Sequence, residues 1–253
     1  GMASSVASGE AGFSLVELAI ALAVLGVMLT GLLGPLQQLR THQRQQDTRA
    51  ALAAIRQGLL GYAMSHGRLP CPADPALADS HAQAGLALPD TGMPCQRQAG
   101  VLPWKTLNAP ALDAWGHRYS YAVAARYSQP VSQLAYPQAS SAAELAEAAW
   151  YVHLTASATP PAAVQQTRLA ALVLSHGANG YGGWDALGQA LPGASASSGE
   201  QLNIVTAGRD LGSNGAPKPF YGPTNPGVDS DDVLEAIPAP LLLHALVSAG
   251  RLP

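Results

Sequence analysis

The amino-acid sequence predicts an α+β protein in which a long N-terminal helix packs on a small antiparallel β-sheet. Three observations lead to this fold class. Residues 13–36 form an apolar run with a single charge, Glu17, and residues 37–66 continue with good helix formers and no proline. Downstream, short segments rich in Val, Leu and Tyr alternate with stretches rich in Gly and Pro, which is typical of strands joined by turns.

The apolar run 13–36 is long enough to cross a bilayer as a helix, because about 20 apolar residues suffice. A carboxylate inside such a segment costs about 2.5–3.5 kcal/mol near the bilayer centre, so Glu17 is expected to have a dedicated partner. A secretory signal peptide would begin with basic residues and have a shorter apolar core. Residues 1–12 contain no Lys or Arg and one acid, Glu10. A plain single-span anchor is the alternative that remains open.

The second half of the helix, residues 37–66, is expected to be amphipathic and to pack on a domain. Its weak point is the stretch 31–35, where glycine and proline predict a kink or local unwinding. The helix should end at residues 67–72, which contain two prolines. Four apolar residues recur at spacings of three and four, and therefore share one face: Leu52, Ile55, Leu59 and Tyr62.

The remaining chain is expected to supply the sheet and its connections. The strand candidates are residues 117–123, 150–155, 169–175 and 229–237, followed by a closing helix over 240–250. Residues 73–103, 126–148 and 177–230 read as loops or insertions rich in small residues, Gly or Pro.

Composition and charge exclude several classes of function. The chain has 253 residues, enough for the helix and one globular domain with its own core. Only 11% of its residues are charged and its net charge is −3, so no basic surface points to nucleic acid.

Cys71 and Cys95 lack the spacing of a zinc site. In an exported domain, such a pair is expected to close a disulfide.

The N-terminal motif Gly12-Phe13-Ser14-Leu15-Val16-Glu17 resembles the type IV pilin and type II secretion pseudopilin superfamily. The resemblance implies that a prepilin peptidase cuts after Gly12 and methylates the new terminus, Phe13. It also implies that Glu17, the fifth residue of the mature protein, pairs with the N-terminal amine of a neighbouring subunit during assembly. The implied fold is the ladle of type IV pilins.

This resemblance divides the chain into four parts. Residues 1–12 are the expected prepilin leader, 13–36 the transmembrane and filament-core half of the helix, 37–66 its amphipathic half, and 67–253 a globular pilin-like domain. A second motif, Asp113-Ala-Trp-Gly-His-Arg-Tyr-Ser-Tyr121, resembles the segment that opens the antiparallel sheet in major pseudopilins.

The acidic run Asp229-Ser230-Asp231-Asp232 is a candidate calcium site. Closely spaced hard oxygen ligands beside a glycine-rich loop suit Ca²⁺, and major pseudopilins bind calcium in a corresponding late loop. However, the run lacks the spacing of an EF-hand. Many pilin relatives also show Ser-His-Gly-x-Asn-Gly followed later by Asp-Asp, as at residues 175–180 and 231–232 here. No cofactor is therefore expected, with Asp229, Asp231 and Asp232 kept as calcium candidates.

Enzyme chemistry is not indicated. Ser175 and His176 are adjacent, so on a strand they point to opposite faces and cannot form a nucleophile–base pair. The sequence carries no hydrolase, zinc-protease, Walker A or dinucleotide-binding motif. No catalytic residue is assigned.

The sequence thus predicts a structural subunit, a major or minor pilin of a type IV pilus-like filament. The expected partners are other pilin subunits, the prepilin peptidase and an inner-membrane assembly platform. The subunit would reside in the inner membrane before assembly, and then in a periplasmic or extracellular filament. The alternative is a pseudopilin of a type II secretion system. A remote alternative is a membrane-anchored surface adhesin or enzyme.

Overall fold

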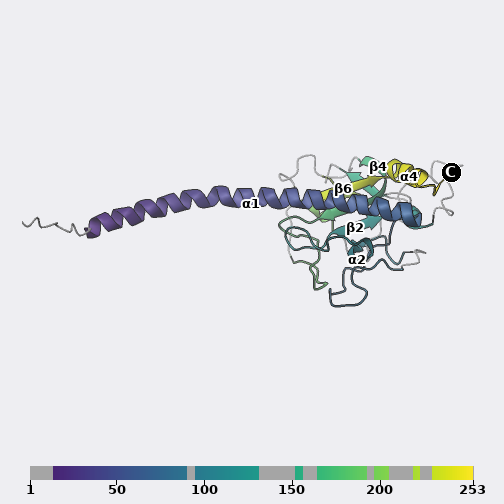
Figure 1. Ribbon diagram of the computed structural model, residues 1–253, viewed down its shortest axis with the longest axis horizontal. Helices are drawn as coiled ribbons and strands as arrows, with labels where there is room; N and C mark the ends of the chain where they lie inside the picture. Colours follow the sequence, from purple (N-terminus) through teal and green to yellow (C-terminus); the bar gives the residue numbers. More distant parts are fainter. Residues whose placement is uncertain are drawn as a thin grey trace, which may run out of the picture. The chain divides into compact units, whose positions relative to one another are not determined.

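The structure is a computed structural model that divides into two compact units, Gly1–Gln43 and Arg44–Pro253 (Figure 1). The residues described are 14–89, 95–130, 152–155, 164–192, 197–204, 219–222 and 230–252.

Helix α1 spans Leu15–His66, which confirms the single long N-terminal helix. Its backbone stays helical through residues 31–35, so the structure does not show the local unwinding that glycine and proline predict there. Among the residues described, no helix is both long enough and apolar enough to cross a bilayer. Of the predicted transmembrane segment 13–36, Phe13 and the side chains of residues 29–36 lie outside this description.

The sheet of the second unit has six strands in the described part of the chain. Along its main path the order is β1-β2-β4-β3-β5, and β6 pairs with β4 off this path. The strands are β1 (Ala99–Val101), β2 (Ser120–Val123), β3 (Val152–Thr155), β4 (Val164–Ser175), β5 (Phe220–Tyr221) and β6 (Val233–Pro238).

Strand β4 is the centre of the sheet, since its residues 171–174 pair with both β2 and β6. The described pairings are antiparallel, as predicted, except that β5 runs parallel to β3. Strand β2 begins at Ser120, three residues later than predicted, and β1, β5 and the short helix α3 (Ser198–Leu202) fall within predicted loops. Most of the predicted insertion 126–148 lies outside the described residues.

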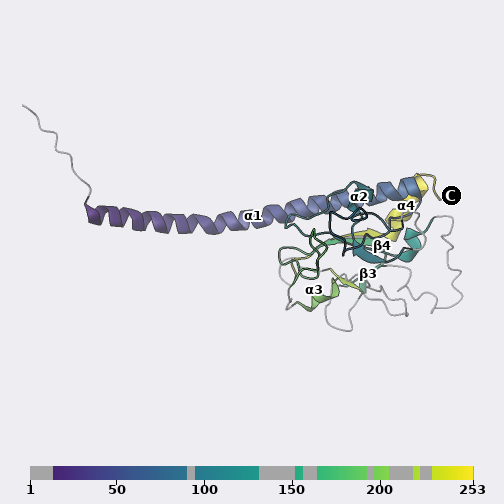
Figure 2. The same cartoon turned by 90° about the horizontal axis from the view of Figure 1, so that it is seen from below.

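The second half of α1 covers one face of the sheet (Figures 1 and 2). The predicted apolar face is confirmed, because Leu52, Ile55 and Leu59 are at most 2% exposed and belong to one core cluster with β2 and β4. An ion pair between Arg56 and Glu235 of β6, 3.1 Å long, lies beside this contact.

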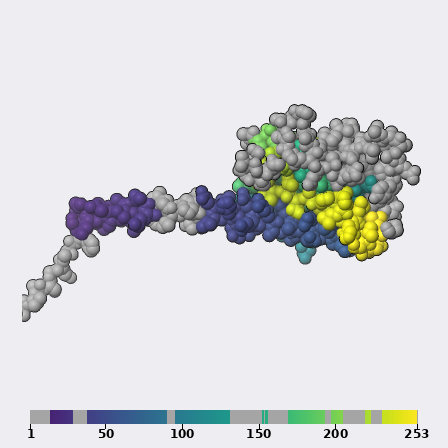
Figure 3. Space-filling view, turned by 90° about the horizontal axis from the view of Figure 1, so that it is seen from above, coloured from purple at the N-terminus to yellow at the C-terminus, as the bar shows by residue number. Residues whose placement is uncertain are grey.

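The closing helix α4 (Ala239–Ser248) matches the predicted helix over 240–250 and completes the core through Leu242 and Leu246. It lies alongside the end of α1, as the adjoining yellow and blue surfaces in Figure 3 show. Arg251, just after α4, donates from Nε to the carbonyl of Met64 at 2.9 Å and from Nη2 to the carbonyl of Ser65. The C-terminal segment therefore satisfies carbonyls at the end of α1 that the helix itself leaves unpaired.

Two short helical segments complete the fold. Helix α2 (Trp104–Leu107) follows β1, and a 3₁₀ turn, η1 (Ala125–Ser128), follows β2.

Candidate functional site

The sequence assigns processing and assembly to Gly12, Phe13 and Glu17, of which the structure describes Glu17. Gly12 and Phe13 lie outside the described residues. Ser14 precedes the helix, and its Oγ accepts a hydrogen bond from the N–H of Val16 at 3.3 Å. Glu17 lies in the first turn with an exposed side chain. A carboxylate at this position interacts favourably with the positive end of the helix dipole.

The described side chains of the first unit expose a large apolar surface. Leu15 is 86% exposed and Val27 is 74% exposed. Contiguous apolar patches of this kind mark interaction surfaces on proteins. The other large apolar side chains exposed along this stretch are Val16, Leu18, Ile20, Leu22, Val24, Leu25 and Met28.

In the second unit, the motif around Asp113 forms a turn that is tied to the end of β4. Oδ1 of Asp113 accepts hydrogen bonds from the N–H groups of Trp115 and His117, both at 2.9 Å. Its Oδ2 accepts from the hydroxyl of Ser175. The ring Nδ1 of His117 lies 3.0 Å from the carbonyl of Gly177. The Asp113–Tyr121 motif and the Ser-His-Gly-x-Asn-Gly motif at residues 175–180 are thus joined by hydrogen bonds.

Ser175 and His176 have different partners, as their opposite directions on the strand require. Ser175 contacts Asp113, whereas Nε2 of His176 is hydrogen-bonded to Oγ of Ser120 at 2.8 Å. Both side chains are fully buried. Their hydrogen bonds join strands and loops, and neither side chain is accessible as a nucleophile.

Arg118 is a buried hub that sequence reasoning missed. Its side chain is 0% exposed and its guanidinium lies 4.8 Å from the centroid of the Trp104 ring. An arginine inside a strand pattern gives no signal that its charge is buried. The guanidinium donates to the carbonyls of Pro75, Leu77 and Ala186, and to Oδ1 of Asp79 at 2.7 Å.

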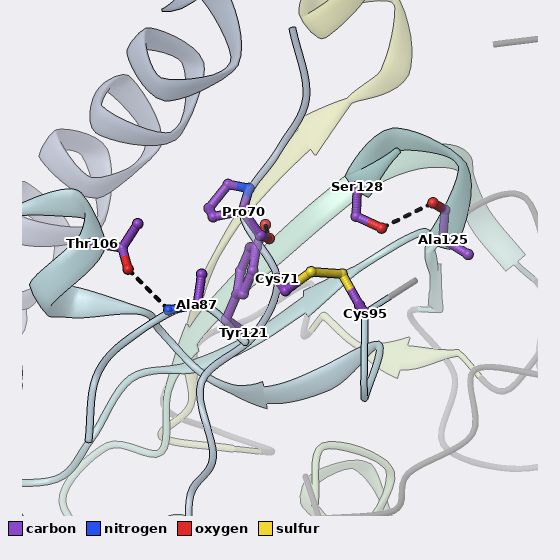
Figure 4. Close-up of a disulfide and its surroundings, with 8 residues drawn as sticks. All are labelled: Pro70, Cys71, Ala87, Cys95, Thr106, Tyr121, Ala125 and Ser128. Atoms are coloured by element: carbon purple, nitrogen blue, oxygen red, sulfur yellow. Dashed lines mark hydrogen bonds between the residues drawn. A yellow bond between two sulfur atoms is a disulfide. The ribbon is translucent and has the colours of Figure 1, made fainter. Parts of the chain in front are cut away.

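The predicted disulfide between Cys71 and Cys95 is present (Figure 4). It closes the connection between α1 and β1, and the hydroxyl of Tyr121 donates to the carbonyl of Pro70 beside it at 3.1 Å. Complete burial raises the pKa of Tyr121 well above its ordinary value, so this hydroxyl keeps its proton and remains a donor.

An ion pair between Asp74 and Arg97, 2.8 Å long, lies near the disulfide in sequence. Partial burial raises the pKa of Asp74, but the hydrogen bond and charge of Arg97, with the N–H of Ala76, outweigh it and lower the pKa below its ordinary value. The carboxylate therefore stays ionised well into the acidic range.

Three carboxylates converge at a second place in this unit. Glu200 of α3 joins Asp231 and Asp232, which directly precede β6, and one oxygen of each lies within 4.8 Å of the others. We call this group the carboxylate cluster. Glu200 is 3% exposed and Asp232 is 2% exposed, whereas Asp231 is half-buried. Asp229, the third calcium candidate of the sequence, lies outside the described residues.

Asparagine side chains and backbone groups hold the cluster in place. The N–H of Asn179 donates to Oδ2 of Asp231 at 2.8 Å, and its side-chain amide donates to Glu200 at 3.1 Å. Asn203 donates to Oδ2 of Asp232 at 2.7 Å. Asn179 belongs to the Ser-His-Gly-x-Asn-Gly motif, so that motif and the later Asp-Asp pair are in contact.

Burial, with neighbouring carboxylates contributing, raises the pKa values of both aspartates. Burial raises the pKa of Asp232 to about 7, with the charges of Glu200 and Asp231 adding to the increase and the Asn203 hydrogen bond opposing it. Burial also raises the pKa of Asp231, again with Glu200 contributing. The folded cluster therefore disfavours three simultaneous negative charges.

Glu200 was not among the sequence candidates. A usable signal was the run Ser197-Ser-Gly-Glu200, which has the spacing of a capping box. Ser197 is indeed the residue that caps α3, and its Oγ accepts from the N–H of Glu200. The pattern predicts a helix start, but its closeness to Asp231 depends on the fold.

Residues 7–33 match the family model of the prokaryotic N-terminal methylation motif. This motif is the signature of the prepilin-type segments of type IV pilins and pseudopilins, and it covers Gly12, Phe13 and Glu17. No curated protein and no solved structure matches the chain. The chain thus carries a prepilin-type N-terminal segment, followed by an α+β unit.

Proposed function

We propose that this protein is a pilin, a structural subunit of a type IV pilus-like filament that is stored in the inner membrane and assembled through α1. The methylation motif at residues 7–33 supports processing by a prepilin peptidase after Gly12 and methylation of Phe13. Storage in the membrane through residues 13–36 rests on the apolar run in the sequence.

The observation that carries the proposal is the contrast between the two halves of α1. From Arg44 onward, the apolar face of the helix is buried on the sheet, as at Leu52 and Ile55. Before Met28, large apolar side chains are exposed, as at Leu15. Exposed apolar surface of this extent favours an apolar environment, which lipid supplies before assembly and neighbouring helices supply within a filament.

Glu17 is placed where it can set the axial register between neighbouring subunits during assembly. Four residues separate it from Phe13, which corresponds to about 6 Å along a helix at 1.5 Å per residue. A neighbouring subunit shifted along the filament axis can therefore bring its N-terminal amine to this carboxylate. In an apolar filament core the two charges compensate each other, because either one alone would be costly to bury.

The second candidate function is that of a pseudopilin in a type II secretion system. The Asp113-x-Trp115-Gly116 turn favours it, because it resembles the segment that opens the sheet in major pseudopilins. Both functions share the peptidase, an inner-membrane assembly platform and subunit–subunit contacts, and they differ in the length and role of the filament.

The test is Glu17→Ala in the native host, with filaments sheared from cells and quantified. We expect strongly reduced incorporation into filaments, because the neighbour's amine loses its counter-charge. Intact mass should show a mature chain that begins at Phe13 and carries one added methyl group. The disulfide and the unfolding transition of the second unit should be unchanged.

Glu235→Ala provides a matched control, since it removes a glutamate that pairs with Arg56 outside the N-terminal segment. This variant should assemble normally. Normal filament yield with Glu17→Ala would exclude the register role. A chain that keeps residues 2–12 in the native host would argue against the prepilin-type subunit altogether.

A further inference from the structure

Charge is unevenly distributed along the part of α1 that follows the apolar run. Residues 18–39 carry no charge, and the next charged side chains are those of Arg40 and Arg44. Asp47 is the only acidic residue between Glu17 and Asp74, whereas arginines occupy positions 40, 44, 49, 56 and 68 of this interval. The helix therefore passes directly from an uncharged stretch to a basic one.

The first two arginines have no carboxylate partner in the part of the chain that the structure describes. Both side chains are exposed, and neither belongs to any of the ion pairs found there. By contrast, Arg56 of the same helix pairs with Glu235 at 3.1 Å. Arg40 and Arg44 are four residues apart in α1, so they are neighbours on one face of the helix. We call them the arginine pair.

The position of the arginine pair along α1 matches the thickness of a bilayer. Helix α1 is continuous from Leu15 to His66, so the uncharged residues 18–39 extend about 33 Å at 1.5 Å per residue. The hydrocarbon core of a bilayer is about 30 Å thick, and each headgroup layer adds about 5–8 Å. Arg40 and Arg44 are about 6 Å apart along the axis. In a subunit stored in the membrane, both therefore fit within one headgroup layer.

Membrane topology does not account for arginines at this place. Lys and Arg beside a membrane helix usually gather on the cytoplasmic side. In the proposed function the second unit is exported, so the arginine pair lies on the opposite side of the membrane. A guanidinium binds a phosphate group through two parallel hydrogen bonds, and lipid phosphates are the anions that a headgroup layer supplies.

We propose that the arginine pair binds the phosphate of an anionic phospholipid in the headgroup layer on the exported side of the membrane. The inference rests on the proposed storage of the subunit in the membrane. Leu39, which is 64% exposed beside Arg40, and the apolar side chains exposed as far as Met28 supply contacts for the acyl chains. The bound lipid fixes the depth at which the subunit is held until assembly withdraws the arginines from the headgroups.

The test uses the full chain, purified in a neutral detergent and freed of lipid. Phosphatidylglycerol or phosphatidylcholine with the same acyl chains is added, and native mass spectrometry measures the bound lipid. An arginine at an anionic surface contributes about fivefold in affinity. We therefore expect phosphatidylglycerol to bind about 5- to 25-fold more tightly than phosphatidylcholine. Raising the ionic strength should reduce this preference, because salt screens exposed charges.

The double variant Arg40→Gln, Arg44→Gln should bind the two lipids almost equally. The matched control is Arg49→Gln, Arg56→Gln, which removes the same charge from the same helix. Arg49 lies about 13 Å beyond Arg40 along the axis, outside the headgroup layer, and Arg56 already has a carboxylate partner. This control should keep the wild-type preference. Thermal unfolding of both double variants checks that the second unit remains folded.

Three results would overturn the inference. The first is equal binding of the two lipids by the wild type, and the second is equal loss of preference in the two double variants. The third is displacement of bound phosphatidylglycerol by inorganic phosphate at equal concentration, which would assign the arginines to a free anion. The experiment needs no filaments. A chain that is cleaved and assembled but shows no lipid preference would contradict this inference alone, whereas an unprocessed chain would contradict the proposed function.

Discussion

Arg118 is a fully buried cation whose charge is met by one carboxylate and three backbone carbonyls. Burying an ion is costly, and the cost is offset only when nearly every donor is satisfied. The planar guanidinium can address several acceptors at once, which a lysine ammonium cannot do with the same geometry. Through these bonds a single side chain holds residues 75–79 and the turn at residue 186.

Arg118→Lys should destabilise the second unit by about 3 kcal/mol, because several carbonyls and the Asp79 carboxylate lose charged hydrogen bonds in a buried place. Arg97→Lys is the matched control. Its ion pair with Asp74 is partly exposed, so the change should cost at most about 1 kcal/mol. Urea unfolding of both variants measures the difference. Equal losses would mean that Arg118 is not the hub of these loops.

At the scale of elements, the connection from α1 to β1 is fastened at several points. The disulfide joins residues 24 apart, close to where α1 ends and β1 begins. Within the loop, Asp74 pairs with Arg97, and Arg118 accounts for the carbonyls of Pro75 and Leu77. A connection that would otherwise be costly in entropy is thus held by covalent, ionic and buried polar contacts.

Replacing both Cys71 and Cys95 with alanine should lower the free energy of unfolding by about 3 kcal/mol, as the chain-entropy model gives for a loop of this length. Reduced wild-type protein should match the double variant in urea unfolding. Thiol labelling of unreduced, denatured wild type should find no free cysteine. A double variant as stable as the oxidised wild type would show that the noncovalent contacts alone hold the loop.

At the scale of the whole molecule, exposed apolar side chains and the buried core belong to different units of the chain. Among the described residues, the buried members of the second unit's core cluster that come from α1 start at Leu52, and the sheet and α4 supply others. The described apolar side chains of the first unit are exposed. If the first unit mediates assembly as proposed, stability of the folded unit and association of subunits can be changed separately.

A chain of residues 44–253 should fold and keep the unfolding midpoint that the second unit shows in the full chain. The reason is that the described core lacks side chains from residues 14–43. Calorimetry in detergent-free buffer measures the midpoint, and near-ultraviolet circular dichroism reports on packing. A molten or aggregated product would mean that the first unit contributes to the fold.

Local regularity made much of this structure predictable from sequence. The spacing of Leu52, Ile55, Leu59 and Tyr62 identified the buried face of α1, because helical periodicity depends only on neighbouring residues. The apolar residues 169–175 were placed within β4 for the same kind of reason. The pairing of Cys71 with Cys95 followed from there being two cysteines, and the N-terminal motif is contiguous.

The tertiary structure alone decided which distant polar residues meet. Glu200 lies about thirty positions before Asp231 in a stretch without periodicity, so no local pattern brings these residues together. The same is true of Arg118 and its carbonyl partners, and of the two-residue strand β5, which pairs parallel to β3. Such contacts form when the core closes and leaves buried polar atoms that must find partners. By itself, the sequence determined the long helix, its buried face and the processing motif; the fold decided how the loops around Arg118 and the carboxylate cluster are built.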